Sequence, residues 1–511
     1  MKPRRVASIM QSLPAPVGGW NARDTIANMK ESDAVVLDNF FPTASDVMVR
    51  KGYANHMTGF AAAVESLLVY ATTAEKLFAC AGTAIYEATA AGAVATAVVT
   101  GLSNSRWQHV NITTAGGSFM YAVNGVDKPL LYNGTTWTAI DGVSTPAITG
   151  VTTTTLKDVT LFKNRLWFAQ ENTLTAWYLP TDSVGGTASP LPLSGVAKRG
   201  GEIVSIGTWT LDAGEGMDDH WVAVTSEGEV IVYKGTDPSS STTWALVGVW
   251  SLGAPIGQRC LLKYAGDILL LCVDGVMPLS RALMAARSDS QVSLSDKIQS
   301  AMTAASVEYG SNFGWQMCHY PKGNMLIVNV PTENDGDNPH QYVMNTITGA
   351  WCRFKGTDAQ CWAIFNDEPY FGGDTTVRKF WSTYADNSTN INARALQAFS
   401  YFGKRGTLKH FKMARPIIAS AGNPSVRAGI NVDYDVSELS GSVSFSPITT
   451  AIWGTSLWGV ATWGGDLTVF KNWQTMGKIG TCGAMNMIAA SQIETRWMVS
   501  DFLYEPGGFV G

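Results

Sequence analysis

Charged residues are scarce in this 511-residue chain: Asp, Glu, Lys and Arg make up 15% of it, against 46% for hydrophobic residues. Charged residues are about 25% of a typical soluble domain. The formal net charge of −5 is mild, which argues against a dedicated nucleic-acid-binding protein with a basic face. A surface with so little charge and so many aromatic residues suggests that other subunits cover much of it.

Long hydrophobic runs are also missing. The richest apolar stretch, Ala88–Val99, is short and rich in Ala and Thr, so it predicts a strand and a turn rather than a membrane span. The sequence MKPRRVASIMQSLPAPVGG begins with basic residues but has no apolar core, so we expect no signal peptide. Seven cysteines stand at irregular spacings without a C-x-x-C pair, which predicts reduced core thiols in a protein made in a cytoplasm.

Motifs for metal binding are incomplete. None of the six histidines has another histidine three or four residues away, so we predict no zinc site. Thr332–His340 is acidic and rich in turn residues, but it lacks the frame and the closing Glu of a calcium loop. Asp218–His220 is a ligand candidate that we interpret instead as a solvated loop before a strand.

Motifs for catalysis are weaker still. The sequence LYNGTTW (Leu131–Trp137) resembles one Asp box of sialidase-type propellers, but Leu130 and Tyr132 replace its Ser and Asp, which favours a hairpin turn with a packed tryptophan. Glu227 and Glu229 flank a glycine and predict another hairpin turn. Neither a nucleophile elbow nor a phosphate-binding GK[ST] loop is present. We predict no enzymatic activity and no catalytic, cofactor-binding or metal-binding residue.

Glycine and aromatic residues are plentiful, and they accompany a repeat. From about residue 60 to 385, a short apolar strand, a polar turn and a second apolar strand recur. The first strands, 42 to 57 residues apart, begin near Leu77, Phe119, Leu166, Trp221, Ile268, Met325 and Tyr370. A period of this size built from hairpins is typical of a β-propeller. We predict an all-β fold in which residues 56–387 form a propeller of six to eight blades; the alternative is an irregular protein of several β-sandwiches.

The two flanks of the chain lack this repeat. Residues 1–55 predict an N-terminal arm that wraps onto a neighbour, with a short helix at Lys30–Phe40. Residues 388–511 predict a separate C-terminal β-rich domain, because segments such as Arg427–Val436 alternate apolar and polar residues. We expect both flanks to supply platform or ring contacts. Another helix is expected at Ser293–Ala305, with a serine at its start as the cap.

Basic residues concentrate at one place in the C-terminal part. The residues are Lys404, Arg405, Lys409, His410, Lys412 and Arg415. They form either a patch that faces DNA or an acidic partner, or a solvated hairpin whose long side chains cover apolar surface.

Three Trp-Gly pairs recur every five residues in WGTSLWGVATWGG, at Trp453, Trp458 and Trp463. A five-residue step matches neither the period of a strand nor that of a helix. Glycine after each tryptophan permits a turn, so we predict three successive bends that each present one ring. These rings pack either inside the subunit or against another subunit or an adaptor.

Five stretches of this chain resemble one viral family, the tail nozzle proteins of short-tailed bacteriophages, also known as the tail tubular protein B type. They are Gly18–Tyr53, Thr225–Arg259 followed by Asp274–Ser280, Gln341–Phe354, Ala398–Ile418 and the Trp-Gly pentads. The stretches keep the order of the family and span nearly the whole chain. The pentads depart from the family, because relatives often carry Asp after the tryptophan.

The resemblance implies a structural virion protein whose subunits each contain a β-propeller. Members form a homohexameric ring below the portal and adaptor, which makes the distal DNA channel and retains the packaged genome until ejection. The implied partners are other copies of the chain, the adaptor ring, tail fibres or spikes and, transiently, genomic double-stranded DNA. The implied location is the short tail of the virion, after synthesis in the bacterial cytoplasm. The mild charge suits a conduit, because strong phosphate contacts would hold back the DNA.

Two other functions stay open at this stage. One is a virion propeller that binds or degrades host glycans, which requires acidic residues converging on one face of the ring. The other is a cellular interaction propeller.

Overall fold

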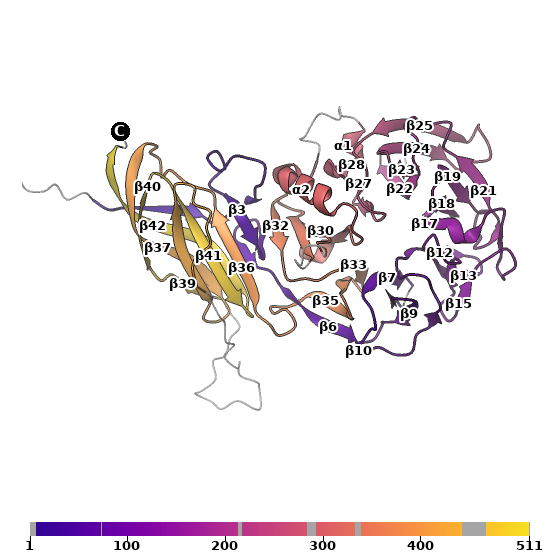
Figure 1. Ribbon diagram of the computed structural model, residues 1–511, viewed down its shortest axis with the longest axis horizontal. Coiled ribbons are helices and arrows are strands. Elements are labelled where there is room, and N and C mark those ends of the chain that lie inside the picture. The colour runs from indigo at the N-terminus through magenta and orange to yellow at the C-terminus, as the bar shows by residue number, and fades with distance from the viewer. Residues whose placement is uncertain are drawn as a thin grey trace, which may run out of the picture.

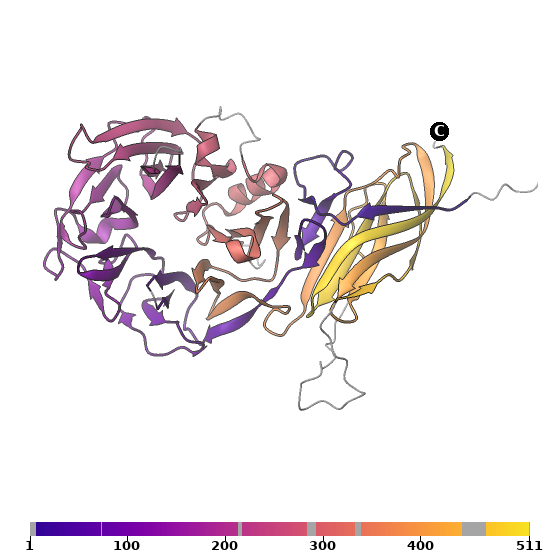
Figure 2. The same ribbon diagram turned by 180° about the vertical axis from the view of Figure 1, so that it is seen from behind.

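The computed structural model describes residues 7–72, 74–212, 217–283, 293–332, 339–441 and 467–509. It contains two bodies that lie side by side, a ring of β-sheets and an elongated β-sandwich (Figure 1). The ring is a β-propeller, so the all-β propeller prediction is confirmed. The view from behind shows the same two bodies, with the N-terminal strands running between them (Figure 2).

The ring contains seven antiparallel sheets among the described residues, which we call blades 1 to 7 in chain order. From the innermost strand outwards, blade 1 contains β7 (Val64–Tyr70), β8 (Lys76–Ala81), β9 (Ala84–Glu87) and β11 (Val99–Thr100), and blade 2 contains β12 (Gln108–Thr114), β13 (Gly117–Val123), β14 (Leu130–Tyr132) and β15 (Trp137–Ala139). Blade 3 contains β17 (Leu156–Phe162), β18 (Arg165–Gln170), β19 (Thr175–Tyr178) and β21 (Ser189–Pro192). Blade 4 contains β22 (Ile203–Asp212), β23 (Met217–Thr225), β24 (Glu229–Gly235) and β25 (Trp244–Ser251). Blade 5 contains β26 (Leu261–Tyr264), β27 (Asp267–Cys272) and β28 (Gly275–Pro278). Blade 6 contains β29 (Gln316–Tyr320), β30 (Met325–Val330), β31 (His340–Asn345) and β32 (Trp351–Phe354). Blade 7 contains β33 (Cys361–Phe365), β34 (Glu368–Gly372), β35 (Thr376–Thr383) and β6 (Gly52–Thr58).

The repeat in the sequence corresponds to the second strand of each blade. These strands are β8, β13, β18, β23, β27, β30 and β34. Each pairs on both edges and packs on both faces against neighbouring blades, so it reads as a short apolar run. In β27, for example, Ile268–Cys272 is buried along its whole length. Between blades 3 and 4, the rings of Trp167 and Trp244 stack 5.4 Å apart.

The ring is closed by a strand from before the propeller in the chain. β6 pairs antiparallel with β35 and becomes the outer strand of blade 7. The first and last propeller strands therefore share one sheet, which ties the ring shut through backbone hydrogen bonds. The short strand β10 (Gly92–Ala93) pairs with β6 on its other edge.

The C-terminal domain is a sandwich of two sheets. The first contains β1 (Ile9–Pro14), β4 (Phe40–Pro42), β5 (Val47–Val49), β37 (Thr407–Ser420), β39 (Thr468–Phe470), β40 (Gln474–Gly480) and β42 (Thr495–Phe509). The second contains β36 (Ile391–Gln397), β38 (Ser425–Val432) and β41 (Gly483–Ser491). It continues through β3 (Asp33–Asp38) into blade 6, with β2 (Gly19–Trp20) alongside, so one nine-stranded sheet crosses both bodies.

The predicted helix at Lys30–Phe40 is wrong. Asp33–Asp38 is the strand β3, because β36 pairs with it along its length and its Ala34 and Leu37 enter the core. Tertiary pairing here overrides local helix propensity. The segment predicted as an arm is described from residue 7, where it supplies strands to the sandwich and to blade 7.

The helix expected at Ser293–Ala305 is present, but it starts later. A short 3₁₀ turn, η3 (Asp296–Ile298), leads into α2 (Gln299–Tyr309). The predicted serine cap is wrong, because neither helix has a side-chain cap and the Ser295 hydroxyl instead accepts a hydrogen bond from the Val276 N–H at 3.0 Å. The remaining short elements are α1 (Leu279–Ala282), η1 (Thr153–Thr155), η4 (Pro321–Gly323), β16 (Ile148–Thr149) and β20 (Gly186–Thr187). In the described part of the chain, no helix has the length and apolar character needed to cross a membrane.

Candidate functional site

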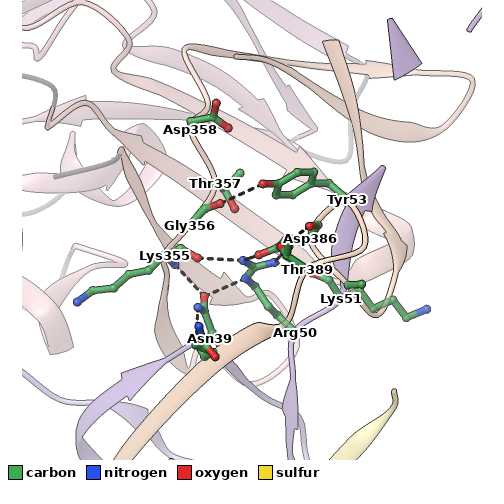
Figure 3. A network of polar contacts seen from close by, with 12 residues as sticks. Asn39, Arg50, Lys51, Tyr53, Lys355, Gly356, Thr357, Asp358, Asp386 and Thr389 are labelled. Carbon is green, nitrogen blue, oxygen red and sulfur yellow. Dashed lines mark hydrogen bonds and ion pairs between the residues drawn. The ribbon is translucent and has the colours of Figure 1, made fainter. Parts of the chain in front are cut away.

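The junction between the two bodies contains a buried polar network centred on Arg50 (Figure 3). The chain passes between the sandwich and the propeller twice, from β5 to β6 and from β35 to β36. Arg50 lies in the first crossing and Asp386 lies in the second. Both side chains are buried, with 0% of Arg50 and 8% of Asp386 exposed.

Every N–H of the Arg50 guanidinium donates a hydrogen bond. The two terminal nitrogens bind the two Asp386 carboxylate oxygens at 2.8 and 2.6 Å. The same nitrogens donate to the carbonyls of Lys51 and Lys355 at 3.1 and 2.9 Å, and Nε donates to Asn39 Oδ1 at 2.9 Å. Such two-point pairing fixes both distance and orientation, so this ion pair locks the two crossing segments together.

Asn39 connects this lock to a third segment. Its Oδ1 also accepts from the Lys355 N–H at 2.8 Å, and its Nδ2 donates to the Asn392 carbonyl of β36 at 2.8 Å. Asn39 has a φ of 57°, a conformation that asparagine tolerates better than most residues. One side chain thereby joins the crossing at Arg50, the end of blade 6 and the sandwich.

A second ion pair holds β3 against blade 6. Arg353 donates to both carboxylate oxygens of Asp38 at 2.8 and 2.9 Å, and these residues are backbone neighbours where β3 meets β32. Gly52 permits the closest approach of the two crossings, because a Cβ there would stand 2.0 Å from the Ala385 carbonyl oxygen. The two bodies therefore form one continuous unit rather than beads on a linker.

The residues of the predicted basic patch do not form one exposed surface in the structure. Strand alternation turns Lys409 inward, where it is 1% exposed and donates to the carbonyls of Lys404, Thr407 and Thr481 at 2.7–3.0 Å. Burial lowers the pKa of its ammonium group. The prediction that Lys409 faces DNA or a partner is therefore wrong.

The other basic residues of this region differ in whether a carboxylate pairs with them. Lys412 pairs with Glu505 at 2.6 Å, and Arg415 pairs with Asp501 at 2.8 Å, so carboxylates offset both charges. Lys404 and Arg405 stay exposed in the loop before β37, and the Arg405 guanidinium lies 4.4 Å from the centre of the Tyr401 ring.

The predicted tryptophan contacts, Trp453, Trp458 and Trp463, lie outside the described residues, as do residues 333–338 of the acidic segment Thr332–His340. Asp218–His220 is not the solvated loop that we predicted. It belongs to β23, where Asp219 pairs with Lys163 at 2.6 Å and His220 is 6% exposed.

Both predicted hairpin turns are confirmed. Between β14 and β15, Asn133 Oδ1 accepts from the N–H groups of Thr135 and Thr136, and the Trp137 ring packs 5.1 Å from that of Phe78. Between β23 and β24, the Glu229 carboxylate is buried and accepts from the Lys198 and Arg199 N–H groups at 3.0 Å.

All seven cysteines are free and buried, as predicted. In the part of the chain that the structure describes, no group of three His, Cys, Asp or Glu side chains is placed to hold a metal ion.

A cavity of about 460 Å³ lies at the centre of the ring, lined by the innermost strands of all seven blades. Several polar side chains on these strands bind the backbone of a neighbouring blade. Gln316 accepts from the Trp362 N–H at 3.0 Å and donates to the Trp362 carbonyl at 2.8 Å. Asn111 of blade 2 accepts from the Ala71 N–H, just after β7, at 3.1 Å and donates to the Val69 carbonyl of β7 at 2.9 Å. These side chains act as staples between blades.

Two titratable residues of the cavity wall are staples as well. Asp158 of blade 3 accepts from the Ser205 hydroxyl and the Ile206 N–H of blade 4, both at 2.8 Å, and burial raises its pKa to about 6. His109 Nε2 accepts from the Val69 N–H at 3.1 Å; burial and the positive charge of Arg259 lower its pKa to about 4. Sequence reasoning missed both residues, because isolated polar residues on these strands follow no repeating pattern.

Comparisons with known proteins identify no family. No family model matches the chain, and no curated protein matches it. Solved structures that it resembles include the extracellular domain of BT3049 from B. thetaiotaomicron, at 11% identity and a TM-score of 0.40, covering 64% of this chain and 41% of that one.

Two further similar structures are smaller propeller proteins. BBS1N, solved in complex with ARL6DN, has 9% identity and a TM-score of 0.40, covering 66% of this chain and 99% of that one. The Cps50 (Swd1) β-propeller domain of Myceliophteria thermophila has 12% identity and a TM-score of 0.39, covering 65% and 100%. Likenesses this weak say nothing about what the present chain binds.

Proposed function

We propose that this protein is a structural component of the short tail of a bacteriophage. In this proposal six copies form the distal nozzle ring of the DNA-ejection channel and help to retain the packaged genome. Its partners are the other subunits, the tail adaptor ring, tail fibres or spikes and the passing double-stranded DNA.

One observation carries the proposal: two of the stretches that resemble nozzle proteins, Gln341–Phe354 and Ala398–Ile418, contact a third, Gly18–Tyr53, where the two bodies join. Gly18–Tyr53 supplies Asn39, Arg50 and the strands β2 to β5. Gln341–Phe354 supplies β31 and β32 of blade 6, and Ala398–Ile418 supplies most of β37 in the sandwich. Stretches far apart in the sequence thus build one feature, as expected if the resemblance reflects a shared subunit architecture.

The junction also suits a load-bearing part. A ring that holds DNA under pressure needs subunits that do not flex between domains. The buried Arg50–Asp386 pair and the nine-stranded sheet that crosses both bodies provide stiffness of this kind. Rigid-body subunits favour closed rings, because each interface repeats the same geometry.

Mass measurement of the purified full-length chain tests the assembly. Mass photometry, alone and with the adaptor ring present, is expected to show a species of six times the 54.8 kDa subunit mass. Electron microscopy of the same sample should show six-fold rings. Monomers under all these conditions would refute the hexameric nozzle.

A second assay distinguishes the nozzle function from the alternative of glycan binding or degradation. Incubation with host capsular polysaccharide or lipopolysaccharide should release no oligosaccharide and give no saturable binding. Turnover of either substrate would favour the alternative over the nozzle.

A further inference from the structure

The central cavity contains more positive charge than its neighbours neutralise. Arg259 lies just before β26 and Lys263 lies on it. Both residues line the cavity together with Asp158. Asp158 already accepts three hydrogen bonds, from the Ser205 hydroxyl and the Ile206 and Val159 N–H groups. Its lone pairs are therefore largely committed to the protein.

Arg259 is held by neutral groups. It donates to the Glu65 carbonyl at 3.0 Å, the Ser66 hydroxyl at 2.6 Å and the Trp107 carbonyl at 3.3 Å. Its guanidinium also lies 5.1 Å from the centre of the Phe313 ring. None of the ion pairs between described residues includes Arg259. The Glu65 carboxylate acts on it electrostatically, but Arg106 and the Ser105 hydroxyl already bind that carboxylate. Its field reaches the cavity wall, where it helps to lower the pKa of His109.

Lys263 reaches into the same cavity. Lys263 is exposed to solvent, and the protein atoms packed around it lower the pKa of its ammonium group. The nearest influential carboxylate, Asp219, is already bound to Lys163 at 2.6 Å. The Lys263 ammonium has no hydrogen-bond or ion-pair partner among the described residues.

Two neutral donors of the wall are also uncommitted. The Gln108 Nε2 group is buried and has no hydrogen-bond partner within the described chain. His109 accepts a hydrogen bond at Nε2, so its proton is on Nδ1 in the neutral ring. Gln108 and His109 are neighbours on β12 and both line the cavity. A buried donor without a partner is costly, so a site of this composition favours an acceptor-rich ligand.

We propose that the central cavity of the propeller binds a small oxyanion, carried as a phosphate or carboxylate group, through Lys263, Gln108 and His109 in the positive field of Arg259. The cavity of about 460 Å³ is within the range of small-molecule sites. The site goes beyond the tail function and does not depend on it, because every contributing residue belongs to one propeller.

Calorimetric titration of the full-length chain with inorganic phosphate tests the site, with sodium chloride at matched ionic strength as the reference. We expect saturable phosphate binding to the native chain and at least tenfold weaker binding to Lys263→Met and to Gln108→Leu. Lys30→Met, the same change at an exposed lysine outside the cavity, should bind phosphate like the native chain.

A second measurement guards against misfolding. Without added anion, Lys263→Met should melt close to the native chain, because Lys263 is exposed and its ammonium group has no partner to lose among the described residues. Phosphate should then raise the Tm of the native chain and of Lys30→Met but not that of Lys263→Met. Equal phosphate effects on all three chains, or an equal effect of sodium chloride, would overturn the proposal.

Citrate distinguishes the two sources of the anionic group. Competition between citrate and phosphate for one saturable site supports a general oxyanion site. Saturable binding of citrate alone supports a site for an organic acid, provided that Lys263→Met abolishes it. Failure of both anions to bind the native chain rejects the site, whatever the outcome of the hexamer experiment.

Discussion

At the scale of single residues, Asp158 shows how a staple becomes sensitive to pH. Its carboxyl group sits at the centre of the propeller, where burial raises its pKa from 3.8 to about 6. The native state therefore holds this proton more tightly than the unfolded chain does. Stability contributed by the protonated form is present below pH 4 and is lost as pH rises towards 6.

We predict that Asp158→Asn removes this dependence. Between pH 4 and pH 6, the native chain should lose up to about 3 kcal/mol of unfolding free energy that the variant does not lose, since one pKa unit corresponds to about 1.4 kcal/mol. Thermal unfolding of both chains across this range gives the difference directly. Subtraction also cancels His109, whose lowered pKa gives the opposite slope. Parallel curves for the two chains would contradict the prediction.

Arg50 and Asp386 make a second prediction at this scale. Arg50→Met leaves a buried carboxylate without its partner, so we expect a loss of about 3–5 kcal/mol. Asp386→Asn should cost a similar amount, and the double variant should cost less than the sum of the two. Chemical unfolding followed by tryptophan fluorescence measures all three.

The control for this cycle is Arg23→Met. Arg23 pairs with Asp24 and Asp296 at the surface, with 46% of its side chain exposed, so the same substitution should cost no more than about 1 kcal/mol. Strictly additive losses in the Arg50–Asp386 cycle would show that the pair does not act as a lock.

At the scale of elements, the two chain crossings depend on close backbone contact. Gly52 starts β6 against the Ala385 carbonyl, where no side chain fits. We predict that Gly52→Ala costs about 1–3 kcal/mol, because the added methyl group forces the two crossings apart. Differential scanning calorimetry of the full-length chain measures the loss.

Gly266→Ala is the matched control, since a Cβ at Gly266 meets nothing within 4 Å. Its Tm should stay close to that of the native chain. Limited proteolysis adds a readout of position, because loosening of the crossings should expose the segment between β35 and β36 in Gly52→Ala only. Equal stability of the two variants would contradict the tight crossing.

At the scale of the whole molecule, charge limits how the protein meets DNA. The net charge is −5, Lys409 is buried, and carboxylates pair with Lys412 and Arg415. Of the five lysines and arginines in the predicted basic patch, only Lys404 and Arg405 remain exposed without a carboxylate partner in the described structure. A conduit needs such weak contacts, because each neutralised phosphate adds affinity.

We therefore predict weak binding of double-stranded DNA that falls further with salt. Fluorescence anisotropy with a labelled duplex should give a Kd no tighter than about 1 μM at physiological salt, in the range of nonspecific binding. Binding measured at low salt should weaken further in the double variant Lys404→Ala, Arg405→Ala. Tight binding at physiological salt would oppose a passive conduit.

The local features of this protein could be predicted from its sequence. The propeller repeat, the hairpin turns and the buried thiols all depend on residues close together in the chain. An apolar run such as Ile268–Cys272, followed by a turn and a second run, forms a hairpin wherever the hairpin sits in the fold. Regular spacing of such hairpins was enough to identify the ring.

Only the tertiary structure decided which distant segments meet. Arg50 and Asp386 stand 336 residues apart, and no local pattern links them. Asp33–Asp38 became a strand because β36 lay beside it, and Lys409 turned inward because of the sheet face that β37 presents to the core. Alternation along a strand predicts that its two faces differ, but the partner sheet decides which face is buried. The sequence by itself determined the propeller, and non-local strand pairing determined the junction that joins it to the sandwich.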